Sequence, residues 1–265
     1  TMGNPFDLEK ILEIARRNDL WIIEDNCDAL GSKYKGKFTG TIGDIGTLSF
    51  YPAHHITTGE GGALTTDNEK LNKIIRSFKD WGRHCWCKPG NDDTCKKRFN
   101  NWLELRPDLI VDDKYVYPRI GYNVQMIDML AAMGIEQLKK LSKIHELRIK
   151  NKEIVENLFK KYIPELKHPI TLEKSKPSWF GTPFICPNKD FKFKLVNFLE
   201  VNGIQTRNYF CGNVLCQKGN KDYGNWKEYL NANQVLEKVF FIGCNPNWNN
   251  EQFNYLERVL KNYGN

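Results

Sequence analysis

The sequence lacks several features that would place the protein in common functional classes. No apolar run is long enough to span a bilayer, which excludes a membrane-spanning helix. Residues 1–6 do not resemble a signal peptide, and no nucleic-acid-binding motif, repeat or low-complexity tract is present. We therefore expect a cytoplasmic protein that acts without a membrane or a nucleic acid. No lysine occurs from Thr39 through Glu69, so no side-chain amine can form a Schiff base there.

What is present is typical of a globular protein. With 265 residues, of which 40% are hydrophobic, the chain can bury a core and form one large domain or two modest ones. Its net charge of +7 suits an anionic ligand such as a nucleotide sugar, although many solvated surfaces have the same balance. The eight cysteines favour metal binding over a disulfide framework if the compartment is reducing.

The hydrophobic pattern predicts an α/β fold. Helix and strand patterns alternate at the start of the chain, as in a doubly wound sheet. Ligands of such sheets lie beyond the carboxyl ends of the strands, which is where Asp25 falls. Asn4 is placed to cap the first helix. The expected elements are helices at residues 4–17, 68–81, 127–159, 190–201 and 250–263 and strands at residues 20–23, 44–51, 63–66, 179–186 and 204–209.

Residues 44–62 combine reactive side chains with a permissive backbone. A short apolar strand ends at Tyr51, and three glycines within residues 59–62 permit positive φ and a close approach of the backbone to a ligand. His54 and His55 lie between them. Because an imidazole can move protons near neutral pH, we predict that the chemistry takes place here.

The same segment resembles the active site of the fold-type-I vitamin B6 enzymes that act on nucleotide-linked sugars, the sugar aminotransferase family. The shared frame is Ser-Phe-x-x-x-Lys-x-x-x-Thr-Gly-Glu-Gly-Gly, in which His54 takes the place of the lysine. An imidazole cannot hold the cofactor as a stable Schiff base, so the resemblance implies untethered pyridoxamine phosphate (PMP) and a reaction other than transamination. The implied α/β fold is that of aspartate aminotransferase, with part of the large domain at residues 1–141 and a small C-terminal α/β domain at residues 142–265.

The resemblance also implies roles for individual residues. His54 would be the catalytic base, Asp25 would keep the pyridine nitrogen protonated, and Ser49 would bind the cofactor phosphate. Asn123 would reach the cofactor of a neighbouring subunit, which implies a homodimer. Considered alone, Asp25, Ser49 and Asn123 are as readily explained as turn, strand-end or cap residues. The candidate cofactor-binding residues are Asp25, Asp28, Ser49, His54 and Asn123, and the candidate substrate-binding residues are His55, Arg207 and Asn213.

Four cysteines share a distinctive spacing. Cys27, Cys85, Cys87 and Cys95 follow the pattern Cys-x57-Cys-x-Cys-x7-Cys, with the last three in an irregular loop at residues 83–98. This pattern resembles the iron-sulfur branch of the family, the CDP-4-keto-6-deoxyglucose 3-dehydrases, and implies a cluster of the 2Fe-2S type. Four thiolates also suit structural zinc, although Cys-x-Cys is unusual in zinc sites.

The resemblance implies a PMP-dependent dehydration at carbon 3 of a CDP-linked 4-keto-6-deoxy sugar, in dideoxysugar and lipopolysaccharide biosynthesis. After PMP condenses with the 4-keto group, His54 would remove a proton from the cofactor methylene and the carbon 3 hydroxyl would leave. An NADH-dependent iron-sulfur flavoprotein reductase would supply electrons through the cluster. Two alternatives stay open: a cluster-free enzyme that deoxygenates and deaminates a GDP-sugar, and a non-catalytic metal-binding scaffold.

Family members begin well upstream of the position equivalent to Thr1. Their upstream portion includes a helix N-terminus that binds the cofactor phosphate and an aromatic residue that covers the cofactor ring. Because helix N-termini are favourable anion sites, we expect the 265 residues alone to have little activity.

Overall fold

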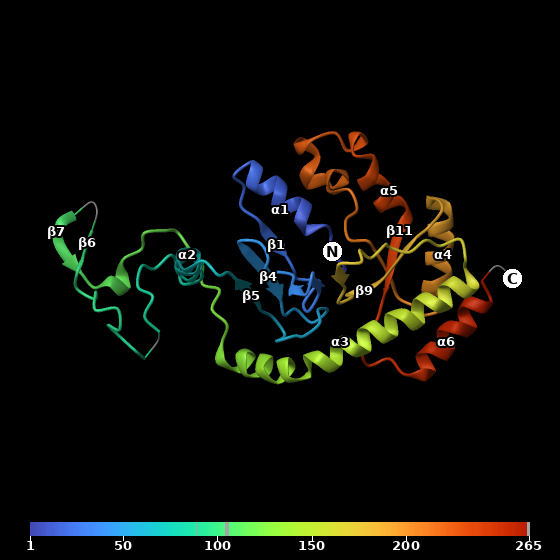
Figure 1. Cartoon of the computed structure of the whole chain (residues 1–265), viewed down its shortest axis with the longest axis horizontal. Helices are drawn as coiled ribbons and strands as arrows, with labels where there is room; N and C mark the ends of the chain where they lie inside the picture. Colours follow the sequence, from blue (N-terminus) through green and yellow to red (C-terminus); the bar gives the residue numbers. More distant parts are fainter. Residues whose placement is uncertain (89, 104–105, 264–265) are drawn as a thin grey trace.

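The computed structural model describes residues 1–88, 90–103 and 106–263. Figure 1 shows a long helix, α3 (Asp128–Tyr162), which passes below the part of the molecule that contains β1, β4 and β5 and continues beside α6 in the C-terminal part. The paired strands β6 and β7 lie beyond α2, at the opposite end of the molecule from the C-terminus (Figure 1). Across the described residues, no helix combines the length and hydropathy needed to cross a membrane.

Single strands or groups of strands separate the α-helices along the chain. The other α-helices are α1 (Leu8–Arg17), α2 (Glu69–Lys79), α4 (Lys189–Val201), α5 (Leu230–Lys238) and α6 (Asn250–Lys261), and the short 3-10 helices are η1 (Asp113–Tyr115), η2 (Val214–Cys216), η3 (Lys218–Tyr223) and η4 (Trp226–Glu228). The strands are β1 (Ile23–Asp25), β2 (Lys33–Tyr34), β3 (Lys37–Phe38), β4 (Ile45–Ser49), β5 (Gly62–Thr65), β6 (Asn101–Leu103), β7 (Arg106–Val111), β8 (Ser175–Lys176), β9 (Gly181–Ile185), β10 (Thr206–Asn208) and β11 (Val239–Gly243).

The first helix begins later than the sequence predicts. Asp7, not Asn4, is its N-cap, and an Asp7 side-chain oxygen accepts a hydrogen bond from the backbone N–H of Lys10 at 3.4 Å. The Asn4 amide donates instead to the carbonyl of Ile170 at 3.0 Å. Both residue types cap helices well, so local propensity did not distinguish them, and the contact with residue 170 decided the outcome.

The sheet under the predicted site has the order β1-β4-β5. Strands β1 and β4 are parallel, with Asp25 opposite Thr47. Strand β5 is antiparallel to β4, because residues 50–61 return the chain directly and contain no crossover helix. The parallel strand direction expected of a doubly wound sheet therefore holds for β1 and β4, although β2 and β3 take the place of a helix between them, and it is wrong for β5.

The main hydrophobic core lies in the C-terminal part, where β10, β11 and β9 form an antiparallel sheet packed against α3 and α4. Phe184 is its centre: this side chain is fully buried, with its ring 4.2 Å from that of Phe159 and 5.4 Å from that of Phe240. The sequence pattern did not predict β11, the central strand of this sheet. Helix α3 runs without a break across the predicted domain boundary at residues 141–142, so the division into two domains stays a prediction.

Replacing Phe184 with alanine should lower the free energy of unfolding by about 3–5 kcal/mol, because a buried ring is lost and a cavity remains. Urea denaturation measures the change. Phe193→Ala is the matched control, since Phe193 on α4 is 69% exposed and should change stability by no more than about 0.5 kcal/mol. Equal loss in the two variants would contradict the placement of the core.

Candidate active site

The carboxylate of Glu24 anchors the end of β1. It is buried and accepts hydrogen bonds from three backbone N–H groups, those of Gly40 at 2.8 Å, Ile42 at 2.7 Å and Gly43 at 2.6 Å. Successive side chains of a strand point to opposite faces. Fixing Glu24 on one face therefore directs Asp25 to the other, at the carboxyl end of β1.

Asp25 is held by its neighbours in an ionised state. One of its oxygens accepts a hydrogen bond from the backbone N–H of Cys27 and another from the hydroxyl of Thr47, both at 3.2 Å. A hydrogen bond from the Cys27 side chain is the main cause that lowers the pKa of Asp25. An exposed carboxylate of this kind can pair with a protonated pyridine nitrogen. Thr47 is not among the residues predicted for the site, although a polar side chain beside Asp25 in a parallel strand pair is a signal that could have identified it.

His54 lies in a tight turn in which its backbone N–H donates to the carbonyl of Tyr51 at 3.0 Å. Its Nδ1 is 3.4 Å from an Asp28 carboxylate oxygen but makes no well-aligned hydrogen bond. The ring of Phe180 lies with its centroid 5.3 Å from that of His54. Burial raises the pKa of Asp28, and the proximity of His54 opposes this shift. Phe180 is also not among the predicted site residues, because nothing in the sequence distinguishes its aromatic ring from core residues in the same apolar run.

The other two candidate cofactor residues lie on different elements. Ser49 ends β4, and its hydroxyl accepts a hydrogen bond from the backbone N–H of Tyr51 at 3.2 Å. Asn123 is exposed and forms an isolated backbone bridge with Asp80, next to the end of α2. None of the side-chain hydrogen bonds found among the described residues joins Asn123 to the site of its own chain, and its role toward a second subunit stays a prediction.

Two candidate substrate residues are buried against protein groups. His55 is 3% exposed, and its Nε2 lies 3.0 Å from the carbonyl oxygen of Ser178. Asn213 is 2% exposed, and its amide donates to the carbonyl of Trp226 at 3.1 Å and to the side-chain oxygen of Asn233 at 2.6 Å. These contacts do not support substrate binding by either residue. Substrate binding by His55 and Asn213 stays a prediction.

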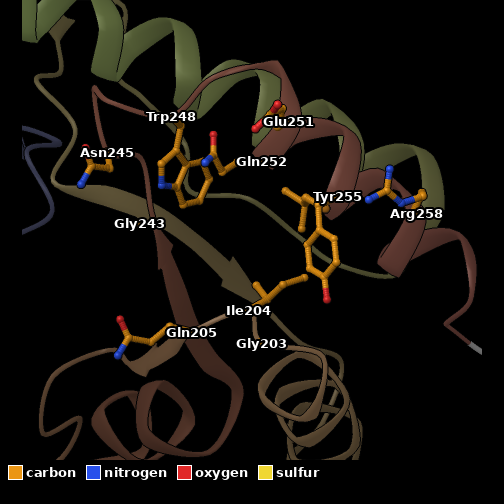
Figure 2. A pocket seen from close by; sticks show the side chains of 11 residues that line it. Gly203, Ile204, Gln205, Gly243, Asn245, Trp248, Glu251, Gln252, Tyr255 and Arg258 are labelled. Carbon is orange, nitrogen blue, oxygen red and sulfur yellow. The ribbon is translucent and has the colours of Figure 1, made fainter.

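Arg207 and a nearby cleft lie on the C-terminal sheet. The Arg207 side chain is exposed on β10 and donates to the carbonyl of Thr206 at 2.9 Å. The cleft, of about 760 Å³, is formed by α6 and the segment before β10; Figure 2 shows Trp248 and Tyr255 on one side of it and Gln205 on the other. No predicted site residue lines this cleft, so it adds nothing to the candidate site.

Three of the four predicted metal-binding cysteines come together. Cys85, Cys87 and Cys95 line one small cavity in the predicted loop at residues 83–98, of which residue 89 lies outside the described residues. A hydrogen bond from Thr94 is the main cause that lowers the pKa of Cys87 to about 7, and hydrogen bonds with the other two cysteines act in the same direction. A thiolate is therefore accessible at neutral pH, as a metal ligand requires.

Cys27 does not line the cavity formed by the other three thiols. Its sulfur lies 3.3 Å from the Thr47 hydroxyl, and burial raises its pKa. Within the ranges that the structure describes, no group of three or more His, Cys, Asp and Glu side chains is arranged to hold a metal ion. The four-thiolate site predicted from the spacing is therefore not formed within this single chain.

The chain is similar to known proteins both in sequence and in structure. The model of the DegT/DnrJ/EryC1/StrS aminotransferase family matches residues 1–261. The chain is 43% identical over 260 residues to the lipopolysaccharide biosynthesis protein RfbH of Salmonella typhimurium. This alignment covers 97% of this chain and 59% of that protein. It is 41% identical over 268 residues to the dTDP-4-dehydro-2,6-dideoxy-D-glucose 3-dehydratase of Saccharopolyspora spinosa. This alignment covers 99% of this chain and 57% of that protein.

Solved structures agree with these relatives. The Escherichia coli GDP-4-keto-6-deoxy-D-mannose-3-dehydratase with bound hydrated pyridoxal phosphate (PLP) superposes with a TM-score of 0.77 at 30% identity, over 98% of this chain and 65% of that one. The predicted fold-type-I class is thereby confirmed. The chain spans less than two thirds of the length of each of these three proteins.

Replacing Glu24 with glutamine should lower the free energy of unfolding by about 1–3 kcal/mol, because one amide nitrogen would then face backbone donors in a buried site. Urea denaturation with circular dichroism measures the effect. Glu153→Gln, at an exposed position on α3, is the control and should leave stability within about 0.5 kcal/mol. If both variants match the wild type, Glu24 does not anchor β1.

Proposed function

Because the chain belongs to the DegT/DnrJ/EryC1/StrS aminotransferase family, we propose that the protein is a PMP-dependent dehydratase acting at carbon 3 of a nucleotide-linked 4-keto-6-deoxy sugar. The observation that carries the proposal is His54, which occupies the lysine position of the family frame and lies beside Asp28. Two of the similar proteins described above are named as sugar 3-dehydratases, which supports the same reaction class.

The residues present fit a B6 cofactor. Asp25 is an ionised carboxylate at the carboxyl end of β1, suited to a pyridinium nitrogen. Ser49 offers a hydroxyl at the end of the adjacent strand, and Nδ1 of His54 lies 3.4 Å from an Asp28 carboxylate oxygen, which leaves Nε2 for the cofactor. When bound, PMP supplies an amine that condenses with a ketone and a ring that stabilises negative charge.

His54 is the proton-transfer group in this proposal. Because its Nδ1 faces Asp28, we assign the transferred proton to Nε2, and the Asp28 carboxylate stabilises the imidazolium that results. The histidine leaves the cofactor untethered, since an imidazole forms no stable Schiff base. Phe180 packs against the imidazole and excludes water from one side of it.

The finer parts of the proposal concern the nucleotide, the partner subunit and the electron donor. The CDP-linked sugar and the NADH-dependent reductase depend on the four-cysteine spacing, which the residues of one chain do not complete as a site. The exposed position of Asn123 supports a homodimer in which that residue serves the neighbouring subunit.

A second candidate function follows from the position of Cys27 outside the cavity of the other three thiols. A dehydratase without a cluster would use the same histidine and PMP to deoxygenate and deaminate a GDP-linked sugar. Such an enzyme needs only the residues that bind the cofactor and the substrate. The cysteine loop would then have a structural role.

Metal analysis separates the two candidates. Iron and acid-labile sulfide in anaerobically purified full-length protein, with visible absorbance that Cys87→Ser abolishes, would support the reductive reaction on a CDP-linked sugar. Cys216→Ser is the control, since this exposed cysteine lies outside the loop and should leave the iron content unchanged. Protein without iron, or with zinc alone, would favour the cluster-free dehydratase.

Replacing His54 with asparagine should lower kcat by about 10²- to 10⁴-fold, because the proton-transfer group is lost. Binding of PMP, followed by its absorbance, should be retained because the imidazole does not tether the cofactor. His168→Asn is the control; this histidine packs on Phe184 in the distant core and should leave kcat unchanged. Full activity of the His54 variant would refute the proposal.

A further inference from the structure

The segment at residues 178–180 is anchored at several points. The backbone N–H of Ser178 donates to the hydroxyl of Ser32 at 2.8 Å, and that hydroxyl donates to the carbonyl of Gly3 at 2.7 Å. The buried guanidinium of Arg148 donates to the carbonyl of Phe180 at 2.9 Å. With its backbone held in this way, the segment presents the ring of Phe180 to His54.

His55 completes the set of anchors from the side of the active-site turn. Its Nε2 lies 3.0 Å from the Ser178 carbonyl oxygen. A carbonyl oxygen only accepts hydrogen bonds, so Nε2 must carry the hydrogen. Nδ1 is buried without a partner, as suits the unprotonated nitrogen of a neutral ring.

The surroundings of His55 keep the ring neutral. The titratable or charged groups near it are Arg148 and His145, both on α3, and His54 on its own turn. The His145 ring lies edge-on at a centroid distance of 5.7 Å. Burial is the main cause that lowers the pKa of His55 to about 3, and Arg148 acts in the same direction. The hydrogen bond to Ser178 therefore persists throughout the pH range of an ordinary enzyme.

We propose that His55 is a positioning residue, whose hydrogen bond to the Ser178 carbonyl ties the active-site turn to the 178–180 segment and thereby holds His54 between Asp28 and Phe180. The inference rests on the proposed function, in which His54 transfers the proton. At 3% exposure His55 has no surface to offer a substrate. Its loss should therefore act on kcat through the placement of His54, since proton transfer depends steeply on geometry.

Two substitutions of His55 test the inference in the full-length protein. His55→Phe keeps a ring but removes the donor, and His55→Gln places an amide N–H near the position of Nε2. We expect the phenylalanine variant to lose about tenfold or more in kcat with KM within about twofold, and the glutamine variant to recover most of that loss. An equal loss in both variants, or a loss confined to KM, would overturn the proposal.

His145→Gln is the matched control, because His145 packs on the same ring, whereas the hydrogen bonds of Ser178 found in the described part of the chain involve His55 and Ser32. Its kcat should stay within about twofold of wild type, as expected if the hydrogen bond rather than the packing positions His54. If this variant loses as much activity as His55→Phe, packing is responsible and the proposal fails.

Nitrogen NMR of the histidine side chains provides a readout that requires neither cofactor nor turnover. From about pH 5 to pH 9, His55 should keep the signals of a neutral ring protonated at Nε2, and the His54 signals should move in His55→Phe but stay near their wild-type positions in His55→Gln. Titration of His55, or unchanged His54 signals in both variants, would overturn the proposal. Absence of dehydratase activity in the wild type would instead refute the proposed function, while the NMR result would still decide whether His55 positions His54.

Discussion

The buried carboxylate of Glu24, with the three backbone amides that donate to it, is the interaction on which the arrangement of the site depends. It ties the end of β1 to residues 40–43, which lead directly into β4. The parallel register of β1 and β4 then brings Thr47 beside Asp25. The buried side chain of Glu24 on one face of β1 thus sets the position of Asp25, the candidate cofactor-binding carboxylate, on the other face.

The two adjacent histidines have opposite environments, although the sequence presents them as equals. His54 lies beside Asp28, whose carboxylate faces its Nδ1, so Nε2 is the nitrogen left for the proposed proton transfer. His55 is buried and bonded to the Ser178 carbonyl. Because neighbouring residues of a turn point in different directions, one imidazole faces the candidate cofactor site while the next joins the interior of the C-terminal part.

For the cysteines, the spacing in the sequence and the positions in the tertiary structure group different residues together. Cys85, Cys87 and Cys95 belong to one short loop, so the local path of the chain suffices to bring their sulfurs to a common cavity. Cys27 follows β1, more than fifty residues earlier, and its place is set by the strand pairing with β4. A pattern of sequence separations cannot show whether such distant positions meet, or whether they meet only between subunits.

The sequence by itself determined the fold class and most helices, and it identified the candidate stretch for the chemistry. Those features depend on local periodicity, on glycine and proline, and on the frame that places His54 where the family has lysine. Only the tertiary structure decided the direction of β5, the central place of β11, the contact of Phe180 with His54 and the burial of His55 and Asn213. The physical reason is that strand pairing and side-chain burial depend on residues far apart in the chain, whose contacts leave no periodic signal in either segment.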